Sequence, residues 1–154
     1  MKIEIDDLTR PQIHALLNEH LQNMHELGPP ESVHALDLDK LRQPGITFWS
    51  AWDGEQLLAI GALKELDASH AELKSMRTPK ALRGRGAGRA ILAHIMQVAQ
   101  ERGYRRVSLE TGTVEAFMPA HRLYESVGFS SCGPFAGYAE DVNSAFMSKA
   151  LGTI

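Results

Sequence analysis

The chain has 154 residues, 44% of them hydrophobic and 23% charged, and a formal net charge of −3. This composition is ordinary for a globular protein, and we expect residues 1–154 to form a single domain. No window approaches the roughly 18 consecutive apolar residues of a membrane span, and the first ten residues lack the apolar run of a signal peptide. We therefore expect a cytoplasmic protein with no membrane partner. Its single cysteine, Cys132, excludes an intrachain disulfide and a cysteine-based metal cluster.

Residues 2–6 alternate in polarity and predict a short strand. Thr9 and Gln12 have the spacing of a capping box, and Pro11 suits a first helical turn, so a helix is expected to begin there. Apolar residues then recur at helical spacing until a Gly-Pro-Pro sequence at 28–30, which should end the helix.

A loop with a short helix is expected over residues 31–41. Two β-rich runs follow at 46–52 and 56–66, and the Asp53-Gly54 pair between them is a strong signal for a hairpin. Residues 71–77, "AELKSMR", form the next strand candidate.

The second half predicts a helix from about Gly86 to Gly103, a strand at 105–110, a short helix at 116–127 and two strands around a loop within 129–151. Taken together, the elements predict an α+β domain in which helices flank a mixed, mostly antiparallel central sheet.

Positive charge is concentrated in one part of this acidic chain. Nine of the 16 Lys and Arg residues lie between positions 74 and 106, where the only acid is Glu101. Such a segment can attract an anionic ligand, although a solvated basic helix face would look the same. Broad nucleic-acid binding usually needs a basic domain, so we expect no nucleic-acid partner.

Within that segment, residues 81–92 read "ALRGRGAGRAIL" and run into the apolar pattern of a helix. A helix N-terminus has unpaired N–H groups and a partial positive charge, and glycines let a phosphate approach those amides closely. Arginine adds charge for further phosphates. The pattern therefore predicts a phosphate or pyrophosphate site on residues 83–89.

Two common phosphate motifs fit this loop poorly. The P-loop requires Lys-Ser or Lys-Thr after its last glycine, whereas Arg89-Ala90 follows Gly88 here. The dinucleotide motif would place its third glycine at position 89. Glu110 ends the next strand about where a ribose-binding acid would stand, so a dinucleotide-binding protein stays open as a distant alternative.

A third pattern, Arg/Gln-x-x-Gly-x-Gly/Ala, matches residues 83–88 completely. This match resembles the acetyl-CoA loop of the GNAT superfamily of N-acetyltransferases. Residues 123–129, "LYESVGF", resemble the Leu-Tyr-Glu-x-x-Gly-Phe signature of the same superfamily, and the resemblance covers residues 71–129. It implies a GNAT-like domain with acetyl-CoA as the acyl donor and a strand backbone that pairs with the pantetheine arm. The CoA-binding residues it implies are Met76, Thr78, Arg83, Gly84, Arg85, Gly86, Ala87, Gly88 and Arg89.

The resemblance also implies a proton donor for the leaving thiolate at Tyr124, and a phenol with a pKa near ~10 suits that task. The alternative is a core tyrosine, since Leu123, Tyr124 and Val127 fall on one helical face.

Some GNAT members carry a catalytic glutamate where this chain has Glu72, eleven residues before Arg83. Strand alternation would put Glu72, Lys74 and Met76 on one face. Glu72 is then either the general base for the amine or a structural partner of Lys74.

The acceptor pocket is expected from residues 28–38 and 133–143. The candidates are Glu31, Ser32, His34, Tyr138 and Asp141. Their acidic balance favours a cationic or polar amine. His121, one turn before Tyr124, could line the site.

The resulting hypothesis is an N-acetyltransferase that moves the acetyl group of acetyl-CoA directly to the amine of a small molecule. The alternative is a non-catalytic acyl-CoA sensor of the same fold. No histidine and carboxylate spacing resembles a metal site, so no metal is expected. Dimers are common in the superfamily, which leaves a homodimer open.

Overall fold

The computed structural model describes residues 1–27, 38–113 and 117–151. In these ranges the strands are β1 (Lys2–Ile5), β2 (Ile46–Asp53), β3 (Gln56–Glu65), β4 (His70–Arg77), β5 (Arg106–Gly112), β6 (Ser130–Cys132) and β7 (Ser144–Ala150). The helices are α1 (Pro11–Leu27), α2 (Leu38–Leu41), α3 (Ala87–Glu101) and α4 (Met118–Ser126), with a 3₁₀ turn at Lys80–Leu82.

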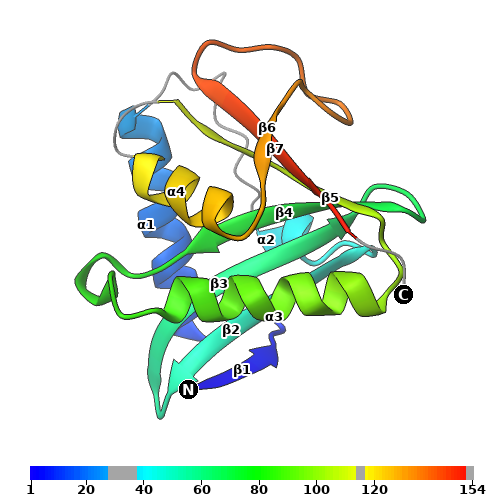
Figure 1. The fold of residues 1–154 in the computed structure, drawn as a ribbon. Helices are drawn as coiled ribbons and strands as arrows, with labels where there is room; N and C mark the ends of the chain where they lie inside the picture. The colour runs from blue at the N-terminus through cyan, green and yellow to red at the C-terminus, as the bar shows by residue number, and fades with distance from the viewer. Residues whose placement is uncertain (28–37, 114–116, 152–154) are drawn as a thin grey trace.

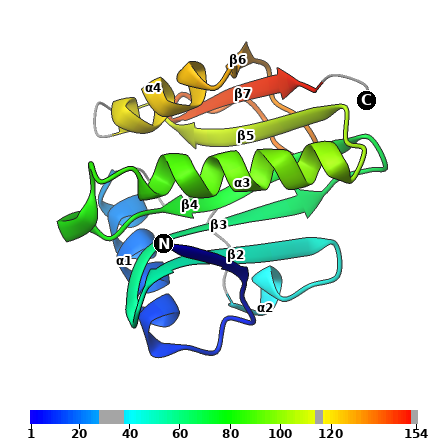
Figure 2. The ribbon, with the colours of Figure 1, turned by 60° about the horizontal axis from the view of Figure 1, so that its bottom comes forward.

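The strands form one sheet in the order β1-β2-β3-β4-β5-β7-β6. Every neighbouring pair is antiparallel except β4 and β5, which run parallel. Helix α3 crosses one face of the sheet and α1 lies behind the other face (Figures 1 and 2). The expected α+β fold with a mostly antiparallel sheet is therefore confirmed. Among the described helices, none is long and apolar enough to cross a membrane.

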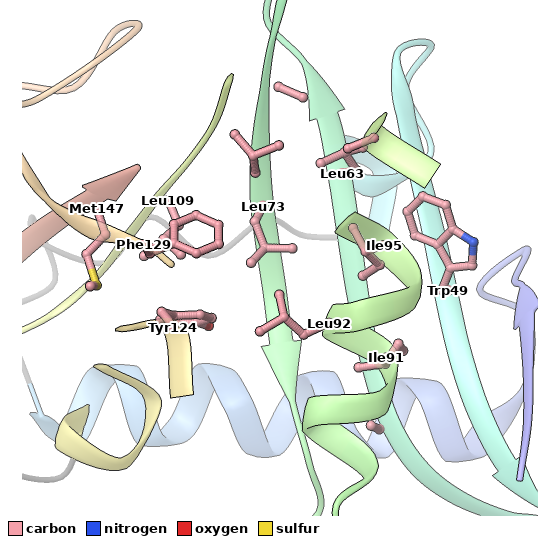
Figure 3. Close-up of a cluster of buried hydrophobic side chains, with 14 of the residues drawn as sticks. Trp49, Leu63, Leu73, Ile91, Leu92, Ile95, Leu109, Tyr124, Phe129 and Met147 are labelled. Atoms are coloured by element: carbon pink, nitrogen blue, oxygen red, sulfur yellow. The ribbon is translucent and has the colours of Figure 1, made fainter. Parts of the chain in front are cut away.

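Each face of the sheet has its own hydrophobic core. On one face, Ile91, Leu92 and Ile95 of α3 pack against buried strand residues such as Trp49 and Leu73 (Figure 3). The spacing of the three α3 residues places them on one side of the helix, which explains the amphipathic pattern of this segment.

The opposite core holds Ile13, Leu16 and Leu17 of α1, which pack in one cluster with Phe48 and Ile60 of the sheet. Two helix-covered faces explain why β2 and β3 read as nearly continuous apolar runs instead of strict alternation.

The expected hairpin joins β2 to β3, with Asp53 paired to Gln56 and Gly54 in the left-handed region at φ 59°. The expected capping box is wrong. Helix α1 begins at Pro11, so Arg10 holds the cap position and its carbonyl accepts the N–H groups of Ile13 and His14.

Both members of the expected box have other partners. The Thr9 hydroxyl donates to Asp7 Oδ1 at 2.6 Å, and Gln12 Nε2 donates to the carbonyl of Glu55 at 3.4 Å. Proline at the first helical position needs no N–H partner, which fixes the start of α1 one residue later than the box requires.

A β-bulge interrupts β4. Ala62 pairs with Lys74 but Ile60 pairs with Arg77, so Ser75 and Met76 together stand opposite a single residue of β3. Ser75 has φ 56°, in the left-handed region, which fits the extra residue of a bulge.

The bulge overturns the expected alternation along β4. Lys74 and Arg77 pair with residues of the α1-side core and lie on that face of the sheet. Met76 instead packs into the α3-side core. There Gly61 makes room for it, since a Cβ on Gly61 would lie 2.6 Å from Met76 Sδ.

Candidate active site

Strands β4 and β5 separate halfway along their length. Their pairing runs from His70 with Arg106 to Leu73 with Leu109 and then stops, because the bulge turns β4 away while β5 remains paired with β7. Both views show the two strands diverging toward α4 (Figures 1 and 2). A cavity of about 790 Å³ lies there, lined by both strands, residues 82–89 and α4.

One end of the cavity is the glycine-arginine loop, residues 83–89, which we call the phosphate loop. Gly84 and Gly86 have φ values of 81° and 85°, a conformation that favours glycine. Gly86 is the N-cap of α3 and makes no side-chain cap, and the first turn carries no acid.

The first hydrogen bond of α3 joins the Ala90 N–H to the Gly86 carbonyl, so the preceding amides lie outside the helical ladder. All seven residues of the loop line the cavity, as do Met76 and Thr78. The cavity therefore brings together all nine residues that the resemblance implies for CoA binding. Glycine backbone, uncapped amides and three arginines fit the phosphates of that group.

Tyr124 lines the same cavity from α4. Its ring belongs to the α3-side core, 5.9 Å from the Phe129 ring, and in Figure 3 its hydroxyl end points toward β4. No described residue forms a hydrogen bond with this hydroxyl. Burial raises the pKa of Tyr124 far above its ordinary value, so the side chain stays protonated at neutral pH.

Glu72, Lys74 and Tyr138 form a hydrogen-bonded network on the opposite face of the sheet. Glu72 Oε2 accepts from the Tyr138 hydroxyl at 2.5 Å and from Lys74 Nζ at 2.9 Å, and Lys74 also donates to the Tyr138 oxygen at 2.9 Å. Burial and the charge of Glu72 raise the pKa of Tyr138 well above its ordinary value. The ion pair between Glu72 and Lys74 is one of the two arrangements expected from the sequence.

The two charged members of the network have different exposure to the cavity. Lys74 lines it, whereas Glu72, with a 3% exposed side chain, is not among the described residues that do. Of this ion pair, the ammonium group therefore borders the cavity and the carboxylate does not.

Residues 12–129 match the family model described as the acetyltransferase (GNAT) family. This chain belongs to the GNAT family. It is 56% identical to the Bacillus subtilis (strain 168) protein named uncharacterized N-acetyltransferase YsnE, over 98% of this chain and 100% of that protein. It is 54% identical to the Escherichia coli (strain K12) protein named uncharacterized N-acetyltransferase YedL, over 97% and 94% of the two chains.

Among solved structures, a Bacillus subtilis acetyltransferase in complex with CoA has a similar fold, with a TM-score of 0.71 and 16% identity over 97% of this chain and 98% of that one. The family membership and the fold agree with the resemblance seen in the sequence.

The residues expected to bind the acceptor lie in different parts of this GNAT domain. Glu31, Ser32 and His34 lie outside the described residues. Tyr138 belongs to the network with Glu72. Asp141 shapes its own loop, since its Oδ1 accepts the Asn143 N–H at 2.8 Å and its carbonyl accepts the Ser144 N–H at 3.0 Å.

His121 is not among the described residues that line the cavity. It instead connects α4 to the end of β5. Its Nε2 lies 2.7 Å from the Gly112 carbonyl oxygen. A Cβ on Gly112 would lie 2.3 Å from the Phe117 ring, so glycine allows α4 to approach β5 closely. His121 therefore supports the helix that carries Tyr124.

Sequence reasoning missed Arg77 and Glu19, which both line the cavity and form an ion pair at 3.1 Å between β4 and α1. No sequence signal links positions 58 residues apart. Within the described ranges, no three metal-binding side chains form a group that could hold an ion.

Proposed function

We propose that this GNAT protein transfers the acetyl group of acetyl-CoA directly to an amine of a small molecule. The observation that carries the proposal is one cavity, opened by the divergence of β4 and β5, that is lined both by the uncapped phosphate loop and by Tyr124. The names of the two relatives, both N-acetyltransferases, support the reaction class.

The phosphate loop would hold the phosphates of the donor through its first-turn amides and its arginines. Beyond Leu73, β4 has no pairing with β5, so its backbone edge is available to the amide groups of the pantetheine arm. This supports backbone contacts at Met76 and Thr78, which line the cavity.

In the transfer, the amine nitrogen forms a bond to the acetyl carbonyl carbon and the carbon–sulfur bond breaks. The Tyr124 hydroxyl donates its proton to the departing thiolate. The neutral amine gives up one proton as the amide forms, and that proton returns through solvent to the Tyr124 oxygen. A raised pKa keeps Tyr124 in the proton-donating form over the physiological range.

We assign Glu72 a positioning role rather than that of the general base. Both of its partners are at hydrogen-bond distance, and it is not among the described residues that line the cavity. The amine then enters in its neutral form, after losing its proton to water. A base role, direct or through a water, is the alternative that the Glu72→Gln experiment below distinguishes.

The test is release of CoA thiol from acetyl-CoA in the presence of a panel of amines. The proposal predicts release that depends on both the enzyme and an amine. Binding of acetyl-CoA without release for any amine would instead support the acyl-CoA sensor.

We further propose a cytoplasmic location, to be checked by cell fractionation, and a homodimer, to be checked by light scattering.

A further inference from the structure

The cavity carries two partly buried cations that lie outside the phosphate loop. Lys74 and Arg77 occupy the same face of β4, toward α1, and both line the cavity. Their side chains are only 9% and 13% exposed. The phosphate loop has three arginines and its own first-turn amides, so Lys74 and Arg77 are additional cations of the cavity.

The ammonium group of Lys74 is held in place with one donor remaining. It has three N–H groups, of which one goes to Glu72 and one to the Tyr138 oxygen, both at 2.9 Å. No described residue accepts the third. A cation nine-tenths buried and fixed by two hydrogen bonds is pre-organised to bind an anion in the cavity.

Arg77 contributes a second positive charge nearby. Its ion pair with Glu19 holds it against α1 at 3.1 Å. Burial, with a smaller contribution from Arg83, lowers the pKa of Arg77, which means that its cationic form would gain from a further negative charge.

The acids that line the cavity are engaged by protein groups. Glu19 pairs with Arg77, and Glu110 accepts the Ser144 hydroxyl at 2.6 Å. Asp141, one of the acids behind the expected cationic acceptor, accepts the Asn143 N–H within its own loop. The case for a cationic acceptor is therefore weakened.

We propose that Lys74, held by Glu72 and Tyr138, binds a carboxylate of the acceptor, so that the acceptor is an amino acid or another amino-carboxylate. This inference rests on the proposed function and narrows its substrate class. In an α-amino acid the carboxylate lies two bonds from the nitrogen, so its capture also fixes the position of the reacting amine.

The test compares amino acids with their carboxamides, which keep the amine and lose the negative charge. We would measure kcat/KM for the twenty standard amino acids and their amides, referred to the concentration of neutral amine so that differences in amine pKa cancel. The wild-type enzyme should prefer the best amino acid over its amide by about 10- to 100-fold, as expected for a charge-assisted hydrogen bond. An amide used as well as its amino acid would overturn the proposal.

Lys74→Met should remove this preference by lowering kcat/KM for the amino acid while leaving the amide nearly unchanged, and Lys74→Arg should restore part of it. Lys64→Met is the matched control. Lys64 pairs with Glu72 across β3 and β4 on the same face, and it does not line the described cavity. A preference that survives Lys74→Met would contradict the assignment.

Lys74→Met leaves the buried Glu72 without its cation and can unfold the protein, so the double variant Glu72→Gln/Lys74→Met supplies a neutral replacement. It should bind acetyl-CoA and show no carboxylate preference; a retained preference would overturn the proposal. If the wild type binds acetyl-CoA but acetylates no amine, the proposed function fails and this inference fails with it. If it acetylates uncharged amines equally well, only the inference fails.

Discussion

The phosphate loop and the Glu72–Lys74–Tyr138 network border one cavity but are assembled in different ways. The loop is seven consecutive residues whose glycine backbone and amides act locally. The network joins β4 to a residue 66 positions away, and the cavity beside it lies where β4 no longer pairs with β5, next to the β-bulge at Ser75. The residues of the loop can be recognised in a short stretch of sequence, whereas the contacts of the network form only when the sheet has formed.

The largest expected effect comes from breaking the local region. Gly86→Glu places an anion at the mouth of the phosphate loop and a side chain at φ 85°, so acetyl-CoA affinity should fall by at least about 100-fold. Isothermal titration calorimetry measures this loss.

Gly103→Glu is the control for backbone strain. Gly103 has the same φ of 85° and open space around it, and it lies at the other end of α3. The Gly103→Glu variant should lose stability but keep the acetyl-CoA affinity of the wild type. Unchanged affinity in a folded Gly86→Glu variant would remove the phosphate-loop assignment.

The second variant breaks the distant region. Glu72→Gln leaves the buried Lys74 without its anion, which should lower the free energy of unfolding by about 3 kcal/mol. If Glu72 only positions Lys74, the pH dependence of kcat/KM keeps its shape.

If Glu72 is the base instead, the acidic limb of that profile disappears and raising the pH partly rescues the variant. Denaturant unfolding together with a full pH profile separates the two roles. Adding Lys74→Met to Glu72→Gln should recover part of the lost stability, because it removes the unpaired cation.

A third variant tests Tyr124, which lines the cavity that both regions border. Tyr124→Phe keeps the ring in the α3-side core and removes only the hydroxyl, so kcat should fall by on the order of 100-fold while acetyl-CoA affinity stays near the wild-type value. Tyr104→Phe is the control, because the Tyr104 hydroxyl donates to Glu65 at 2.8 Å and is not in the described cavity. Equal kcat in both variants under conditions where chemistry limits the rate would return Tyr124 to a packing role.

The smallest effect concerns stability at alkaline pH. Burial raises the pKa of Tyr124 in the folded state, so the folded protein resists ionisation of this side chain. The stability that the neutral Tyr124 contributes is therefore fully present below pH ~10, the ordinary tyrosine pKa, and is lost as the pH rises above that value. At pH 11 the loss is about 1.4 kcal/mol for a tyrosine that stays neutral when folded. Tyr124→Phe should therefore lose less stability than the wild type between pH 9 and 11, measured by urea unfolding. Equal losses of unfolding free energy between pH 9 and 11 in the wild type and in Tyr124→Phe would contradict the burial of this hydroxyl.

The same contrast explains what could be predicted from the sequence. The hairpin at Asp53-Gly54, helix α3 and the fold family follow from local patterns and two spaced motifs. The capping box failed because the Thr9 hydroxyl donates to Asp7, two residues earlier, and Gln12 donates to Glu55, 43 residues away. Only the contact of Gln12 lies beyond the reach of a local pattern.

The predicted face of Met76, shared with Glu72 and Lys74, was wrong for a related reason. A single added residue in β4 reverses every side chain beyond it, and the glycine that accommodates Met76, Gly61, lies on another strand. The ion pair of Arg77 with Glu19 likewise needs the packing of α1 against the sheet. Spacing along the chain carries no information on such contacts.

Direct transfer of the acetyl group is tested most directly by following that group itself. Acetyl-CoA labelled with ¹³C in the acetyl group would be incubated with the protein and a panel of amines that includes the amino acids, and the products would be identified by mass spectrometry while CoA thiol is titrated. Direct transfer predicts a labelled N-acetyl product formed in equal amount to the released CoA, and its loss in Gly86→Glu. Tight binding of acetyl-CoA with no labelled amine in the panel would contradict it.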